Sequence, residues 1–195
     1  MNNPTLNHKY VADFYHTIED KKIENLYDFQ KYDKIFSNLN DEYNGMPTEI
    51  LAEFYFSRGY YPDINKVHHT SDDKYRKGID FVFESFDRKK GYIQVKGHSD
   101  PKVLFGDTKN EVNLGTFITE TIDVDRNKRI LFVPYLTHDP KNNKNIFSSE
   151  FKPANLDLIR VISKSQFQKH VLKDPNFWSD FVKCLKKSSK KFKRL

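Results

Sequence analysis

Two short apolar runs separated by a charged turn constrain the fold of this chain more than any other feature. The first run, GIDFVFESF, begins at Gly78, and the second, GYIQVKG, begins at Gly91. Both are rich in β-branched and aromatic residues, and residues 87–90 between them are charged, so the pair predicts an antiparallel β-hairpin. Two further apolar runs, RILFVPYL (129–136) and DLIRVIS (157–163), predict additional strands.

Helices are expected before and after these strands in the sequence. Apolar residues spaced by three and four predict helices over 10–18 and 23–36, and a last helix over 177–185. The segment TEILAEFYFSRGYY predicts a helix that is capped by Thr48 and ended by Gly59. The order of elements predicts an α/β fold, in which helices flank a mixed β-sheet.

Length and composition indicate one globular domain. The chain has 195 residues, of which 37% are hydrophobic and 31% are charged. It contains no apolar run of the roughly 18 residues that a membrane helix needs. We therefore expect no membrane partner. A single cysteine, Cys184, excludes an internal disulfide and a zinc site made of cysteines, so we expect an intracellular, reducing compartment. No phosphate-binding GxxxxGK[ST] loop is present, which argues against an ATPase motor.

The excess of positive charge is concentrated at one end of the sequence. The net charge is +6, and residues 183–195 hold seven of the 33 Lys and Arg residues and no acid. We therefore expect a helical extension over 1–44, a core domain over 45–182 and a basic tail over 183–195. Such a tail suits a phosphate backbone, although a solvated helix end or a linker to a further segment explains the same charges.

The hairpin also carries a set of polar residues suited to catalysis. Side chains alternate along a strand, so Gln94 and Lys96 share one face and Val95 points to the other. Antiparallel pairing brings Asp80 of the first strand beside them. A carboxylate binds Mg²⁺, the metal activates water, and a nearby lysine stabilises the charge of a phosphoryl transition state. The alternative is an ordinary amphipathic hairpin, with Gln94 and Lys96 on its wet face.

The helix before the hairpin adds two acids. Glu49 and Glu53 are four residues apart and so lie on one helix face. Glu49 stands in the first turn, where the helix dipole stabilises a carboxylate. A carboxylate from this helix, packed beside the sheet, would add a metal ligand or position a water. An ordinary first-turn acid at Glu49, and an ion pair between Glu53 and Arg58, explain the same residues. His68 and His69 fall in a polar stretch, 62–77, and are expected to be solvated.

Taken in order, three segments, GMPTEILAEFYFSRGYYPDI, KGIDFVFES and GYIQVKG, resemble the core of the restriction-endonuclease-like, or PD-(D/E)xK, superfamily. They are most similar to its Mrr-like branch, which includes nuclease domains of phage and mobile-element helicases. That branch has a helical Glu before a Gly-aromatic pair, then Gly-x-Asp, then Gln-x-Lys. The matching positions are Glu49, Asp80, Gln94 and Lys96, and the resemblance covers 45–97 well. Glu49 matches the helical position better than Glu53, which is kept in reserve. Gln94 stands where most members of the superfamily have Glu or Asp.

The resemblance implies a restriction-endonuclease-like fold and an endonuclease that hydrolyses DNA with Mg²⁺ or Mn²⁺. Glu49 and Asp80 would hold the metal with help from Gln94 and the carbonyl of Val95, and Lys96 would activate water or stabilise the transition state. A homodimer is left open, because many such enzymes pair to cut both strands. Apart from the resemblance, the charges of the sequence predict contacts with nucleic acid, although a solvated charged loop explains the first three residues equally well: Lys74, Arg76, Lys77, His98, Lys190 and Lys191.

Two other functions fit the same sequence. Since a neutral amide is a weaker Mg²⁺ ligand than a carboxylate, Gln94 is compatible with a catalytically degenerate DNA-binding module. The chain also fits an N-terminal nuclease or recruiting domain of a larger helicase-type protein, in which residues 183–195 would form a linker.

Overall fold

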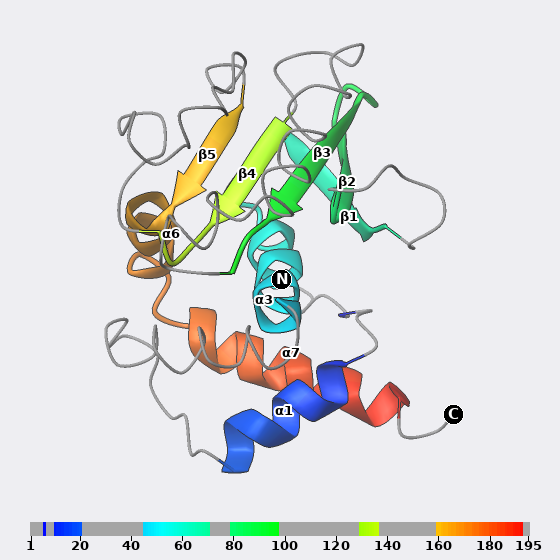
Figure 1. The fold of residues 1–195 in the computed structure, drawn as a ribbon, viewed down its shortest axis with the longest axis vertical. Coiled ribbons are helices and arrows are strands. Elements are labelled where there is room, and N and C mark those ends of the chain that lie inside the picture. Colours follow the sequence, from blue (N-terminus) through cyan, green and yellow to red (C-terminus); the bar gives the residue numbers. More distant parts are fainter. Residues whose placement is uncertain are drawn as a thin grey trace, which may run out of the picture.

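The computed structural model describes residues 6, 10–20, 45–70, 79–97, 129–136 and 159–192. Five strands form one mixed sheet with helices packed around it (Figure 1), which confirms the expected α/β class. The elements are α1 (Val11–Asp20), α3 (Met46–Ser57), β1 (Ile64–His69), β2 (Phe81–Ser85), β3 (Lys90–Val95), β4 (Arg129–Val133), β5 (Arg160–Ser163), α6 (Lys164–Val171) and α7 (Phe177–Phe192). The helix expected over 23–36 lies outside the described residues.

The strands follow one another across the sheet in the order β1-β2-β3-β4-β5. The first three are antiparallel neighbours, and β3, β4 and β5 run parallel. The expected hairpin is confirmed as β2 and β3, with Phe81 opposite Ile93 and Glu84 opposite Lys90. All five residues of β4 are buried, as is usual for a strand inside a parallel sheet.

Strand β1 corrects the sequence-based expectation of a polar loop over 62–77. Its sequence, INKVHH, is mostly polar because β1 is an edge strand with one exposed face, so it lacks the apolar run that identifies inner strands. Its ladder with β2 shifts register between Ile64 and Lys66. Residues 71–78, which include Lys74, Arg76 and Lys77, lie outside the described part of the chain.

Helix α3 is a core helix rather than an amphipathic one. Ten of its twelve residues are buried, which requires apolar contacts on almost every side. It begins at Met46, two residues before the expected Thr48 cap. Gly45 occupies the N-cap position with φ 84°, a left-handed conformation that glycine adopts readily, and Pro47 fits the first turn because that turn needs no amide donor there.

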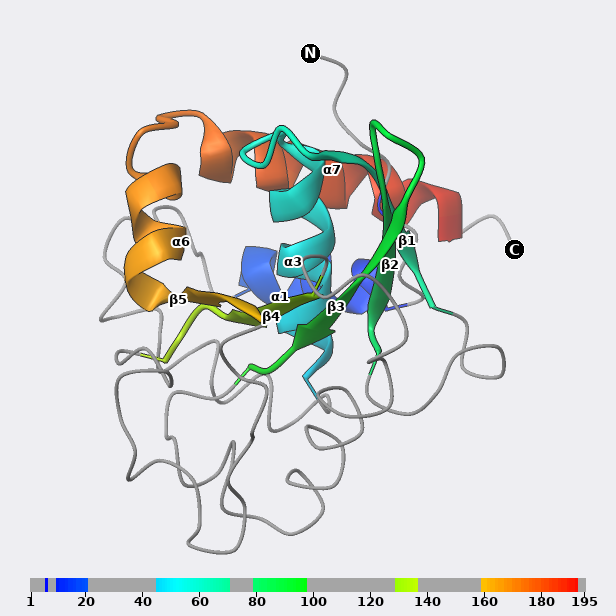
Figure 2. The same ribbon diagram turned by 90° about the horizontal axis from the view of Figure 1, so that it is seen from above.

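Figure 2 shows α3 lying between the sheet and α7. On the sheet side, the ring of Tyr55 stacks on that of Phe132 of β4, with 5.2 Å between centroids. On the other side, Phe54 contacts Phe177 and Phe181 of α7 at 5.2 and 5.1 Å. Aromatic side chains therefore fix α3 to both layers, and this fixes the position of its first turn relative to the hairpin.

The two ends of the described chain pack together through α1 and α7 (Figure 1). The amide of Leu6 donates a hydrogen bond to Ser188 Oγ at 3.1 Å. The expected boundary at 183 falls inside α7, and Cys184 on that helix is fully buried. As far as Phe192, the residues expected to form a basic tail are thus part of a packed helix. No helix of the described residues is long and apolar enough to span a bilayer.

Arg58, which follows α3, ties this helix to α7 and the turn before it. Its guanidinium contacts the carboxylate of Asp174 at 2.5 Å and that of Asp180 at 3.0 Å. The Arg58 side chain is only 12% exposed, so these charges are largely desolvated. Tyr60 also donates a hydrogen bond to Asp174, at 2.7 Å. These contacts therefore join α3, α7 and the turn before α7 at the C-terminal end of α3, which is the end farther from Glu49.

Replacing Arg58 with methionine should lower the free energy of unfolding by about 2–4 kcal/mol, because it leaves the carboxylate of Asp174 without its cation and removes one of the two cations beside Asp180. Urea unfolding measures the change. Lys183→Met is the matched control: its ammonium also contacts Asp180, at 3.4 Å, but its side chain is 67% exposed. That exposed pair should contribute less than about 1 kcal/mol. Equal effects of the two substitutions would contradict this assignment.

Candidate active site

The predicted catalytic residues of the hairpin meet where β3 ends. Asp80 directly precedes β2, Gln94 and Val95 are the last residues of β3, and Lys96 follows. The amide of Asp80 donates to the carbonyl of Ile93 at 3.0 Å, and that of Lys96 donates to the carbonyl of Phe132 at 2.9 Å. The sheet ladder therefore fixes the backbone on both sides of the group.

Direct hydrogen bonds connect Asp80 to β3. Its Oδ2 atom accepts from the amide of Val95 at 2.6 Å and from Nε2 of Gln94 at 3.0 Å. The same Nε2 lies 3.4 Å from the carbonyl oxygen of Val95. Gln94 is 4% exposed, and its Oε1 atom is buried with no hydrogen-bond partner among the described residues. The structure thus brings together three of the residues that the sequence singled out.

Electrostatics link Glu49 and Lys96 to this group. Burial and, after it, the negative charge of Glu49 raise the pKa of Asp80 to about 7, although the amide of Val95 and the charges of Lys96 and His69 act in the opposite direction. Burial lowers the pKa of Lys96, while Asp80 and Glu49 oppose that change. Two carboxylates and one ammonium therefore act on each other in a partly desolvated site, which is typical of catalytic centres.

The structure adds His69 to the site and corrects its expected solvation. His69 ends β1, and its Nε2 atom lies 3.1 Å from Oε2 of Glu49. Its ring contacts Phe81 edge-on at 5.1 Å between centroids. Glu53, the reserve candidate, is 5% exposed and buried, whereas the Glu49 side chain is 23% exposed. The hydrogen bond with His69 is made by Glu49. That Glu49 rather than Glu53 is the metal-binding acid stays a prediction.

The His69–Glu49 pair should stabilise the protein in a limited pH range. The hydrogen bond with Glu49 raises the pKa of His69 above 6.5, although burial opposes it. The stabilisation is thus complete below about pH 6.5 and is lost as the pH rises through the folded-state pKa. His69→Gln should lower the free energy of unfolding by about 0.5–1 kcal/mol near pH 5.5 and by less near pH 8.5. His68→Gln, at an exposed position of the same strand, is the control; a loss with no pH dependence would contradict the charged pair.

The residues expected to contact nucleic acid are only partly described. Lys190 and Lys191 are exposed on α7, which α3 separates from the sheet (Figure 2). His98 lies outside the described residues, as do Lys74, Arg76 and Lys77. The expectation that these four contact DNA therefore stays a prediction.

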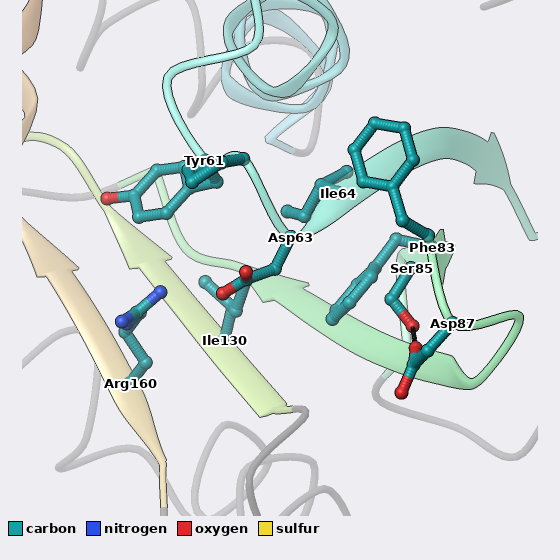
Figure 3. A pocket seen from close by; sticks show the side chains of 10 residues that line it. Tyr61, Asp63, Ile64, Phe83, Ser85, Asp87, Ile130 and Arg160 are labelled. Atoms are coloured by element: carbon teal, nitrogen blue, oxygen red, sulfur yellow. Dashed lines mark hydrogen bonds between the residues drawn. The ribbon is translucent and has the colours of Figure 1, made fainter.

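A cavity of about 370 Å³ lies at the opposite ends of the strands (Figure 3). It is bordered by the first residues of β1, β4 and β5 and by the end of β2. The guanidinium of Arg160 lies over the ring of Tyr61 at 5.4 Å, and Asp63 and Asp87 are also among the residues that line the cavity. Because both signs of charge line the cavity, its charge does not indicate one class of ligand, and it is separate from the Asp80 group.

The donor atoms at the Asp80 group suit a hard cation. Among the described residues, no group of three or more His, Cys, Asp and Glu is arranged to hold a metal. The candidate set is of another kind: two carboxylates, from Glu49 and Asp80, the amide oxygen of Gln94 and the carbonyl of Val95. Oxygen atoms of these types are ligands of Mg²⁺ and Ca²⁺. A buried acceptor without a donor, as Gln94 Oε1 is, costs free energy unless a cation or water binds it.

No family model, no curated protein and no solved structure matches this chain. The α/β class therefore rests on the sheet and helices themselves. The restriction-endonuclease-like core remains an expectation from the motif.

Proposed function

We propose that this chain is a metal-dependent endonuclease that hydrolyses DNA phosphodiester bonds. The observation that carries the proposal is the contact between Asp80 and the end of β3, through the side chain of Gln94 and the backbone of Val95, directly beside Lys96. Residues that are 14 positions apart in the sequence thus form one polar group, and Glu49 from α3 acts on its charges. Such a group has the components of metal-assisted phosphodiester hydrolysis.

Each residue has a role in this proposal. Glu49, Asp80, the amide oxygen of Gln94 and the carbonyl of Val95 would hold Mg²⁺ or Mn²⁺. When bound, the metal would neutralise phosphate charge and lower the pKa of a bound water. Asp80 binds a cation in its ionised form, so cation binding should strengthen as the pH rises through about 7.

Lys96 would act on the phosphate and the attacking water. Its ammonium lies in the field of both carboxylates, which oppose the lowering of its pKa by burial. A protonated lysine there can donate to the attacking water or to a phosphate oxygen as negative charge develops on it. The burial that lowers the pKa of Lys96 also strengthens these hydrogen bonds, because less water competes for them.

Two features support DNA as the substrate. The motif resembles nucleases of the Mrr-like branch, which act on DNA. In addition, α7 exposes Lys183, Lys186, Lys187, Lys190 and Lys191 along its outer side. Lysines in this arrangement bind phosphate backbones without reading sequence, and the affinity falls as salt rises.

A degenerate DNA-binding module is the second candidate. It is favoured by the amide group of Gln94, which already satisfies Asp80 and the carbonyl of Val95 without a cation. Such a module would bind DNA in a salt-sensitive way and would not cut it. A role as the nuclease or recruiting domain of a larger helicase-type protein stays a further prediction.

Purified protein incubated with supercoiled DNA tests the proposal. Mg²⁺ or Mn²⁺ should produce nicked and linear DNA, and EDTA should prevent it. Salt-sensitive DNA binding with no cleavage under either metal would overturn the endonuclease and favour the binding module.

A further inference from the structure

The amide group of Gln94 occupies the place where the proposed cation would meet its ligands. Its nitrogen faces Asp80 Oδ2 at 3.0 Å and the carbonyl oxygen of Val95 at 3.4 Å. These are two of the oxygens assigned above to the metal. Its own oxygen, the third, is buried and has no hydrogen-bond partner among the described residues. In this arrangement the amide nitrogen, and not the amide oxygen, faces the ligands.

Hydrogen-bonding capacity explains this orientation. An ionised carboxylate and a backbone carbonyl only accept, so the group between them has to be a donor or a cation. The two ends of a side-chain amide have nearly the same size. A half-turn about the last side-chain bond therefore exchanges nitrogen and oxygen without a change in volume. After that turn, oxygens of Asp80, Val95 and Gln94 converge, which is repulsive without a cation and favourable with one.

We propose that Gln94 is a two-position switch, in which the NH₂ group seals the metal-free site and a half-turn presents Oε1 to an arriving divalent cation. This inference rests on the proposed metal site. It accounts for an amide at a position where most members of the superfamily have a carboxylate. A glutamate that is 4% exposed beside Asp80 would place two negative charges together in a desolvated site. Glutamine avoids that repulsion in the metal-free protein, and its cost is weaker metal binding.

Gln94→Glu tests the metal-free side of the switch. In EDTA near pH 8, its melting temperature should be lower than that of the wild type by roughly 5 °C, because the repulsion between two buried carboxylates is unrelieved. Saturating Mn²⁺ should remove this difference, and Mn²⁺ should bind the variant about 10-fold more tightly than the wild type. Gln168→Glu adds the same charge at a partly exposed position of α6 and should change neither quantity.

The side-chain NH₂ resonances of Gln94 test the rotation itself. They can be followed by NMR in protein made with isotope-labelled glutamine, and assigned by their loss in Gln94→Glu. Mg²⁺ should shift both proton resonances, because the NH₂ group leaves Asp80 and the carbonyl of Val95.

Four outcomes decide between the switch and the proposed function. Mg²⁺ binding with unmoved Gln94 resonances, or a Gln94→Glu protein as stable as the wild type in EDTA, would overturn the switch. Failure to bind either metal would overturn it too. Moving resonances without DNA cleavage would uphold the switch and reject the endonuclease.

Discussion

Replacing Lys96 with methionine is expected to slow Mg²⁺-dependent DNA cleavage by about 10²–10³-fold, the loss typical for one group that stabilises transition-state charge. Methionine keeps much of the apolar stem of lysine and removes the ammonium. The effect should be large because Lys96 is partly buried and lies in the field of Asp80 and Glu49, where water screens charge poorly. Metal binding should persist, since Lys96 supplies no ligand.

The same strand offers a matched control for this substitution. Lys90 begins β3 and is exposed, and it lies at the opposite end of the strand from Lys96. Lys90→Met should therefore cleave at close to the rate of the wild type. Equal rates for Lys96→Met and Lys90→Met, measured with the same DNA, would remove Lys96 from the reaction.

Asp80→Asn should have two opposite effects. It should abolish detectable metal-dependent cleavage, because a neutral amide replaces a carboxylate ligand. It should also raise the free energy of unfolding in EDTA near pH 8 by about 1–3 kcal/mol, because a buried charge is removed. Asparagine can keep the hydrogen bond from the amide of Val95, since its side-chain oxygen accepts in place of Oδ2.

The pH dependence of this gain follows from the pKa of Asp80. Its folded-state pKa is raised from 3.8 to about 7, mainly by burial. Between these values the folded protein holds the proton more firmly than the unfolded chain, so stability falls as the pH rises from about 4 to about 7. The gain from Asp80→Asn should therefore be small near pH 4 and complete above pH 7. Urea unfolding across this range measures it.

Asp63→Asn is the control for stability, because Asp63 is exposed and removed from the site. It should change the free energy of unfolding by less than about 0.5 kcal/mol at any of these pH values. An Asp80→Asn protein that is less stable than the wild type near pH 8 would contradict the raised pKa.

Sequence patterns were sufficient wherever apolar residues alone decide the structure. The hairpin of β2 and β3, the inner strand β4 and the core helix α3 all have apolar runs that only one kind of element can bury. The meeting of Asp80 with Gln94 followed from antiparallel pairing across that hairpin. These inferences need only strand alternation and a short turn.

The rest depends on contacts that no local pattern encodes. Strand β1 was not predicted, because an edge strand needs few apolar residues. The contact between His69, at the end of β1, and Glu49 was therefore not predicted either. The second half of α7 resembled a solvated tail because Ser188 and Ser189, beside Cys184 and Leu185, form much of its buried side. The orientation of the Gln94 amide depends on which neighbours accept hydrogen bonds, which only the folded structure shows.

The most direct test of the proposed metal-dependent nuclease centre is cleavage of supercoiled DNA by three proteins in parallel: the wild type, Lys96→Met and Asp80→Asn. Each is incubated with Mn²⁺ and, separately, with EDTA, and DNA binding is measured over a range of salt. We expect the wild type to cut the DNA only with Mn²⁺, Lys96→Met to cut it far more slowly and Asp80→Asn not to cut it detectably, while all three bind DNA with the same salt dependence. Cleavage by both variants at the rate of the wild type would contradict a nuclease centre at the end of β3.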